Sequence, residues 1–132
     1  MPFDLVPDPV RRTRAERGRA NYHAGHAAEA SVARHYEDRG ITICARNWRG
    51  LTGEIDLIGR QGAEVIFVEV KQSRSHDLAA SHLSQGQSRR IFASVEEFLA
   101  GEPAGLLTDV RIDLALVDGQ GRIEVVENAF AG

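Results

Sequence analysis

The stretch GEIDLIGRQGAEVIFVEVK, residues 53–71, decides the fold because it predicts a β-hairpin. Its second half, VIFVEV, is a run of β-branched and aromatic residues that is typical of a strand. Its first half alternates, so that Ile55 and Leu57 share one face of the sheet. Glu54 and Asp56 share the other face, and the segment RQGAE between the two halves predicts the turn.

The register of this hairpin brings charged side chains together. A turn centred on its Gly-Ala pair gives cross-strand partners whose residue numbers sum to 125. Asp56 then lies opposite Glu69, and Glu54 lies opposite Lys71, with opposed Cβ atoms about 5 Å apart. The register therefore predicts three acids and one lysine on one patch, which a slip of one residue would scatter.

The opposed carboxylates repel each other, so protonation, Lys71 or a bound cation must compensate. An oxygen-rich pair suits Mg²⁺, which takes one or two carboxylates together with waters and phosphate oxygens. Such an ion lowers the pKa of a bound water, and Lys71 beside it could orient that water for attack. The alternative is a surface salt-bridge cluster in which Lys71 pairs both acids, and the spacing alone favours this alternative.

Outward from the hairpin, the sequence predicts one mixed α/β domain with the order α-β-β-β-α-β-β. The first helix is expected where Ala28, Val32 and Tyr36 form an apolar stripe. Helices are expected at 21–39 and about 85–100, strands at 41–48, 54–59, 65–70, 110–117 and 123–126, and a loop at 73–84. Residues 1–20 hold three of the four prolines and an arginine-rich stretch, which predicts a flexible arm before a domain over 21–132.

The composition is that of an ordinary globular domain, with 132 residues of which 42% are hydrophobic. No apolar run approaches the roughly 18 residues that span a bilayer. With no secretory signal and a single cysteine, a cytoplasmic protein without a membrane partner is expected. The net charge of −3 predicts modest DNA affinity for a monomer, so a homodimer that doubles the contact surface is an open alternative.

Lys71 is the one lysine among 16 basic residues, and it stands in an apolar strand. An ammonium group is a compact point charge, whereas a guanidinium group is a broad fork. A site that needs a compact cation would explain the exception, and so would chance.

The segment NWRGLTGEIDLIGRQGAEVIFVEVK, residues 47–71, resembles the YraN-like family of uncharacterised bacterial proteins. Three further segments match this family: GHAAEASVARHYEDRG at 25–40, SRRI at 88–91 and RIDLALVDGQGRIEVVENAF at 111–130. The family is similar to the PD-(D/E)xK nuclease superfamily, which includes Holliday-junction resolvases and the RecB nuclease domain. The resemblance implies a restriction-endonuclease-like core, a mixed central sheet of about five strands flanked by helices.

The resemblance also implies a metal-dependent endonuclease that hydrolyses DNA phosphodiester bonds, with branched or single-stranded DNA as candidate substrates. Asp56 and Glu69 would hold Mg²⁺ or Mn²⁺, and Lys71 would be the catalytic cation. Glu29 matches the first-helix acid of such sites, and its place on the inward side of the helix suits a metal ligand as well as an acid at the helix edge. Glu54 is a candidate additional acid.

Nucleic-acid contacts are expected from polar residues near the hairpin and on the second helix. They are Arg49, Arg74, Gln87, Arg89 and Arg90. The family usually has VKTRS where this chain has VKQSRS, and often a lysine in place of Gln87, so the differences fall among the DNA contacts. The competing prediction is a non-catalytic adaptor that retains the fold and binds nucleic acid or a protein partner.

Overall fold

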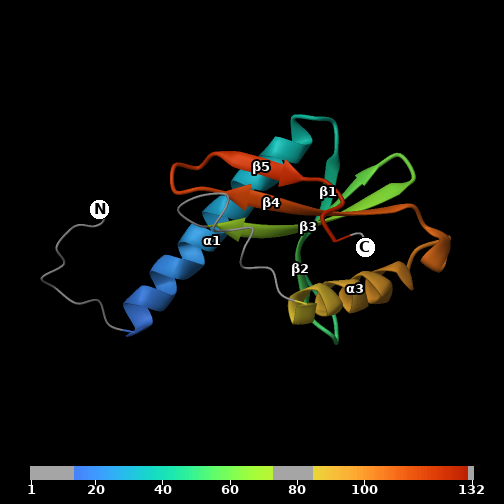
Figure 1. Cartoon of the computed structure of the whole chain (residues 1–132), viewed down its shortest axis with the longest axis horizontal. Helices are drawn as coiled ribbons and strands as arrows, with labels where there is room; N and C mark the ends of the chain where they lie inside the picture. The colour runs from blue at the N-terminus through green and yellow to red at the C-terminus, as the bar shows by residue number, and fades with distance from the viewer. Residues whose placement is uncertain (1–13, 73–84, 131–132) are drawn as a thin grey trace, which may run out of the picture.

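The computed structural model describes residues 14–72 and 85–130, and the side chains of residues 25–72 and 88–130. Its elements are α1 (Arg14–Glu37), β1 (Thr42–Arg49), β2 (Glu54–Gln61), β3 (Glu64–Gln72), α3 (Gln85–Leu99), η1 (Gly105–Leu107), β4 (Val110–Val117) and β5 (Ile123–Val126). The strands form one five-stranded sheet in the order β1-β2-β3-β4-β5 (Figure 1). The predicted α/β class, mixed five-stranded sheet and element order are confirmed.

The sheet is mixed because of the connection between β3 and β4. These two strands run parallel, whereas the pairs β1–β2, β2–β3 and β4–β5 are antiparallel. A parallel pair needs a long crossover connection, and α3 lies within this one. The expected loop at 73–84 belongs to the same connection and lies outside the described residues.

Helix α1 begins at Arg14, so the expected start of the first helix at residue 21 is wrong. Arginine, alanine and glutamate are strong helix formers, and they extend the helix beyond the apolar stripe that packs on the sheet. The stripe itself is confirmed, because Ala28, Val32 and Tyr36 are buried. Residues 1–13 lie outside the described residues. Although α1 has 24 residues, neither it nor any other described helix is apolar enough to cross a membrane.

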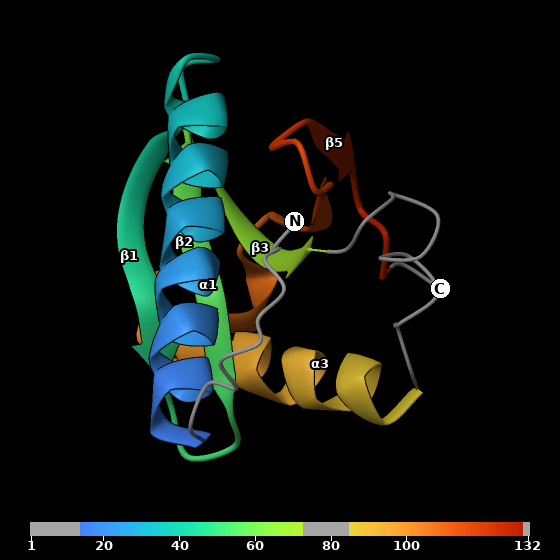
Figure 2. The ribbon, with the colours of Figure 1, turned by 90° about the vertical axis from the view of Figure 1, so that its left-hand side faces the viewer.

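The sheet separates two hydrophobic cores, one under each helix. Val32 of α1 belongs to the same core as Ile66 and Val68 of β3. Val95 of α3 belongs to the other core, together with Phe67. Neighbouring residues of β3 therefore face opposite helices, and Figure 2 shows α1 upright beside β1 and β2 with α3 crossing below. Burial of each such side chain contributes about 1.5–3 kcal/mol.

The β2–β3 hairpin has the predicted register over its paired part, where the numbers of partner residues sum to 125. The last pair in this described ladder is Leu57 with Val68. Beyond it, β2 continues beside β1, and β3 continues beside β4. The two strands of the hairpin therefore diverge. The ladder therefore contains neither of the expected pairs Asp56–Glu69 and Glu54–Lys71, and Glu54 pairs with Arg49 on the β1 side.

Strand β2 also breaks its alternation at this point. Ile55 belongs to the core under α3, whereas Leu57 belongs to the core under α1. In a regular strand these two residues would share a face, so the expectation that they do is wrong. The strand rotates where it leaves β3, and Asp56 lies at the rotation.

Candidate active site

The predicted acids meet where the hairpin opens, in a region that we call the fork: residues 54–56 of β2 and 69–72 of β3. Asp56 closes the inner end of the fork, since its Oδ2 accepts a hydrogen bond of 2.8 Å from the N–H of Val70. A buried backbone N–H needs an acceptor, and here a side chain replaces a strand carbonyl. The backbone of β3 thereby fixes the Asp56 carboxylate.

The carboxyl groups of Glu69 and Asp56 are neighbours inside the fork. Burial and this contact with a second carboxylate raise the pKa of Glu69, whereas the nearby Lys71 ammonium lowers it. Two neighbouring carboxylates repel each other, so a proton or a cation between them is favourable. The structure thus brings Asp56, Glu69 and Lys71 together, and it gives the two acids a need for a proton or a cation.

Glu29 approaches the same acids from α1. Burial and the charge of Asp56 raise the pKa of Glu29, while the nearby Asn47 side chain lowers it. The Glu29 carboxylate also lies 3.9 Å from the imidazole of His26. Within the part of the chain that the structure describes, however, no three His, Cys, Asp or Glu side chains form a metal-binding group. The geometry therefore offers a two-carboxylate site with Glu29 as a neighbour.

Asn47 is a member of this neighbourhood that the sequence did not predict. Its backbone has a φ of 51°, in the left-handed region that few non-glycine residues adopt. Arg46 and Trp48, on either side of Asn47 in β1, pair with Leu57 and Ile55, on either side of Asp56 in β2. Asn47 therefore lies beside Asp56 in the sheet. From there its side chain lies near Glu29 and lowers the pKa of that carboxyl group. Unusual backbone conformations of this kind gather at functional sites.

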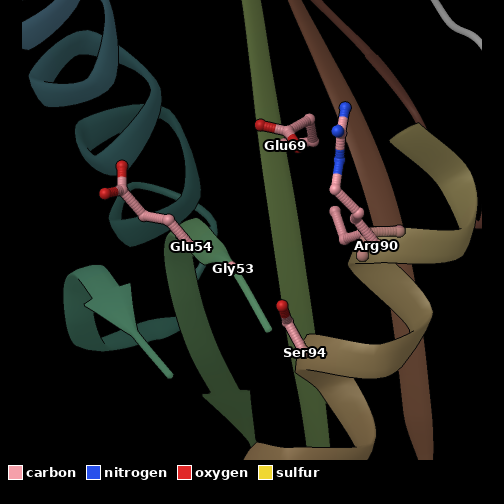
Figure 3. Close-up of a pocket in the computed structure, with 6 residues that line it drawn as sticks. Gly53, Glu54, Glu69, Arg90 and Ser94 are labelled. Atoms are coloured by element: carbon pink, nitrogen blue, oxygen red, sulfur yellow. The ribbon is translucent and has the colours of Figure 1, made fainter. Parts of the chain in front are cut away.

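A pocket of about 130 Å³ opens at the fork, between the sheet and α3. Its walls are formed by Gly53, Glu54, Glu69, Arg90, Ile91 and Ser94. Figure 3 shows Glu69 of β3 and Arg90 of α3 side by side, whereas the carboxylate of Glu54 points away from Arg90. Ser94 was not predicted, because it lies among the apolar residues of α3, yet it is buried at the base of this pocket. Glu69 and Arg90 thus place a carboxyl group and a guanidinium group on one pocket, and such a set suits a cation bound together with a phosphate.

The predicted nucleic-acid contacts are only partly placed by the described residues. Arg90 lines the pocket, and Arg89 beside it on α3 is exposed. Arg49 is 81% exposed, and its Nε lies 2.8 Å from Oε2 of Glu54. Glu54 therefore pairs with Arg49 and also lines the pocket. Arg74 and the side chain of Gln87 lie outside the described residues.

The sequence matches the family model of "Uncharacterised protein family UPF0102" over residues 28–117, which include the whole fork. A UPF0102 protein of Cereibacter sphaeroides is 60% identical over 114 residues, which are 86% of this chain and 97% of the relative. One of Ruegeria pomeroyi is 59% identical over 88% of this chain and 94% of the relative. One of Roseobacter denitrificans is 53% identical over 93% and 95%. The chain therefore belongs to the uncharacterised protein family UPF0102.

Proposed function

We propose that this protein is a metal-dependent endonuclease that hydrolyses DNA phosphodiester bonds at the fork. The observation that supports the proposal is the pair of neighbouring carboxyl groups of Asp56 and Glu69, with Lys71 nearby and Arg90 on the pocket that Glu69 lines. Two adjacent carboxyl groups that need a proton or a cation fit Mg²⁺ or Mn²⁺. Such ions use hard oxygen ligands, and Mg²⁺ takes one or two carboxylates and completes its shell with waters and phosphate oxygens.

Asp56 and Glu69 would hold the ion, which would neutralise phosphate charge and lower the pKa of a bound water. Lys71 would orient the attacking water and stabilise the charge that builds on the phosphate oxygens. Arg90 would contact the phosphate from α3. In the reaction the water oxygen bonds to phosphorus, the bond from phosphorus to one sugar oxygen breaks, and that oxygen takes up a proton. Glu29 is the proposed additional acid.

A second candidate function is a non-catalytic adaptor that keeps the nuclease-like fold and binds nucleic acid or a protein. The absence of a three-acid group among the described residues favours it. An adaptor would need neither the ion nor Lys71, so the two functions differ in measurable ways.

Calorimetric titration with Mg²⁺ and Mn²⁺ tests the ion first. The informative variant is Asp56→Asn, which keeps an oxygen for the Val70 N–H but removes the charge. The matched control is Asp109→Asn, an exposed acid that precedes β4. We expect wild type and Asp109→Asn to bind one ion and Asp56→Asn to lose it. A wild-type protein that binds neither metal contradicts the nuclease proposal.

Cleavage assays then separate the enzyme from the adaptor. Branched, nicked, single-stranded and intact duplex DNA are incubated with wild type, Lys71→Ala and Asp109→Asn in Mg²⁺. We expect Lys71→Ala to be slower by about 100-fold or more, as for loss of one transition-state donor. If wild type binds DNA but leaves every substrate intact, the adaptor is the better account.

A further inference from the structure

Leu51 is 98% exposed at the tip of the loop that joins β1 to β2. We call residues 50–53 the Leu51 loop. Single exposed leucines are common on protein surfaces and need no explanation by themselves. This one differs because the loop that carries it is held firmly in place.

The carboxylate of Glu97 on α3 ties down the Leu51 loop. It accepts hydrogen bonds from the N–H of Leu51 at 2.9 and 2.8 Å, and from the N–H and hydroxyl of Thr52 at 3.3 and 3.1 Å. The N–H of Gly50 donates to the carbonyl of Gly53 at 2.9 Å. A Cβ atom on Gly50 would lie only 2.4 Å from the Glu97 carboxylate, so the loop is in close contact with α3. The backbone is therefore anchored while the Leu51 side chain stays in water.

The Leu51 loop lies along the same side of α3 as the pocket. Arg90 and Ser94 line the pocket, Ser94 Oγ lies 3.4 Å from the hydroxyl of Thr52, and Glu97 holds the loop. These three α3 residues follow one another at helical spacings of four and three, which places them on one face. Seven residues of helix rise about 10 Å, so Glu97, which anchors the Leu51 loop, follows Arg90 by about 10 Å along the helix. That distance spans about three nucleotides of one strand.

We propose that Leu51 is an apolar wedge that recognises unstacked bases about three nucleotides from the phosphate held in the pocket. The proposal rests on the nuclease function and names its substrate class, which is DNA with an interrupted base stack. An aliphatic side chain gains nothing from phosphates or from water, but it gains burial between base steps. The unstacking that this requires costs least where the stack is already broken, as at a branch, a gap or a single-stranded end.

Guanidinium groups near the loop make nucleic acid the fitting occupant, because such groups bind phosphate well. Arg49 directly precedes the loop, is 81% exposed and pairs with Glu54, and Arg90 lines the pocket together with Gly53 of the loop. A protein partner is the competing occupant of an exposed leucine, and it would give no preference among DNA structures.

The test compares DNA binding by wild type, Leu51→Ser, Leu51→Met and Leu107→Ser. Leu107 is the matched control, because it is 89% exposed on η1, away from the pocket. The DNA carries 2-aminopurine at successive positions beside a branch, and Ca²⁺ replaces Mg²⁺ so that the DNA stays intact. We expect wild type and Leu107→Ser to brighten the probe most about three nucleotides from the site of cleavage. Leu51→Ser should bind branched DNA about tenfold more weakly with duplex binding unchanged, and Leu51→Met should restore the preference.

Two results overturn the wedge. One is a Leu51→Ser protein that brightens and binds branched DNA as Leu107→Ser does, while wild type still cleaves DNA in Mg²⁺; the nuclease function would then stand without the wedge. The other is an equal loss of affinity for branched and intact DNA, which would assign Leu51 a contact without structural preference. A wild-type protein that neither binds nor cleaves any DNA removes the nuclease function and the wedge together.

Discussion

Replacement of Asp113 by alanine tests whether one buried carboxylate holds three parts of the chain together. Asp113 lies on β4 with no solvent exposure. It accepts hydrogen bonds from the hydroxyl of Tyr36 on α1 at 2.7 Å and from the N–H of Asn128, after β5, at 3.0 Å. The guanidinium of Arg111 donates to it as well, with Nε at 2.9 Å. Removing the carboxylate leaves all of these donors without their acceptor.

The size of the effect follows from what each donor can do next. Loss of one partner of a buried ion pair costs about 3–5 kcal/mol. The Arg111 side chain is 20% exposed and lies 3.7 Å from Glu127, so water and this second acid can partly take over. Tyr36 is only 3% exposed, so its hydroxyl loses its acceptor in the core. We therefore expect Asp113→Ala to lower the free energy of unfolding by about 3–4 kcal/mol.

Urea unfolding at neutral pH measures this loss against two companions. Asp113→Asn keeps the volume and one oxygen, so its loss should be smaller, and it supplies the measurement if the alanine variant does not fold. Asp109→Asn changes an exposed acid nearby in sequence and should stay within about 0.5 kcal/mol of wild type. An Asp113→Ala protein within about 1 kcal/mol of wild type would refute the view that these bonds stabilise the fold.

Three further predictions concern α1, β1 and the Leu51 loop. Burial and the Asp113 carboxylate raise the pKa of Tyr36, so its contribution to stability is complete below about pH 10 and is lost as the pH rises further, by at most about 1.4 kcal/mol per pH unit. Urea unfolding of wild type and Tyr36→Phe between pH 9 and 11 tests this, because the variant should lack the loss. If the free energy of unfolding falls with pH equally in both proteins, the prediction is contradicted. Glycine adopts the positive φ of residue 47 without strain, whereas alanine does not. The Asn47→Ala protein should therefore be less stable than the Asn47→Gly protein by about 1 kcal/mol. Both should weaken Mg²⁺ binding in calorimetry, and unchanged binding would deny the side chain a positioning role. Gly50→Ala and Glu97→Ala should each speed hydrogen exchange of the Leu51 and Thr52 amides about tenfold. These amides should exchange no faster in the double variant than in either single variant. Additive increases in the exchange rate would show that Gly50 and Glu97 anchor the loop independently.

The parts of the fold that were predicted from sequence are those fixed by local interactions. Strands β4 and β5 have the predicted bounds because a self-contained turn separates them. In that turn the Asp118 carboxylate accepts hydrogen bonds from the N–H groups of Gln120 and Arg122, both at 2.9 Å. The start of α1 was missed because helix propensity alone extends it. The divergence of β2 from β3 was missed because it depends on β1 and β4, which lie elsewhere in the sequence.

The candidate site divides in the same way. Asp56, Glu69 and Lys71 could be found because one hairpin with a short turn carries all three. Asn47 and Glu97 could not, because their roles arise from contacts across the fold. Glu97 accepts a hydrogen bond from the N–H of Leu51, which is 46 residues away in the sequence. Nothing in the sequence around a helical glutamate predicts a partner at such a separation. The left-handed backbone of Asn47 likewise leaves no trace in the residue pattern around it.

The divergence that the sequence did not predict is what makes the site chemically possible. In a continuous hairpin ladder, the N–H of Val70 would bond to a strand carbonyl, and two opposed acids would repel each other on a flat surface. In the fork, Val70 instead uses one oxygen of Asp56, which fixes this carboxylate, while the neighbouring Glu69 lines the pocket. Asp56 therefore has a structural role and a proposed chemical role. Asp56→Ala would remove both at once, so its loss of activity would not identify a metal ligand. Asp56→Asn keeps an acceptor for the Val70 N–H, and only this variant separates loss of the ion from loss of the fork.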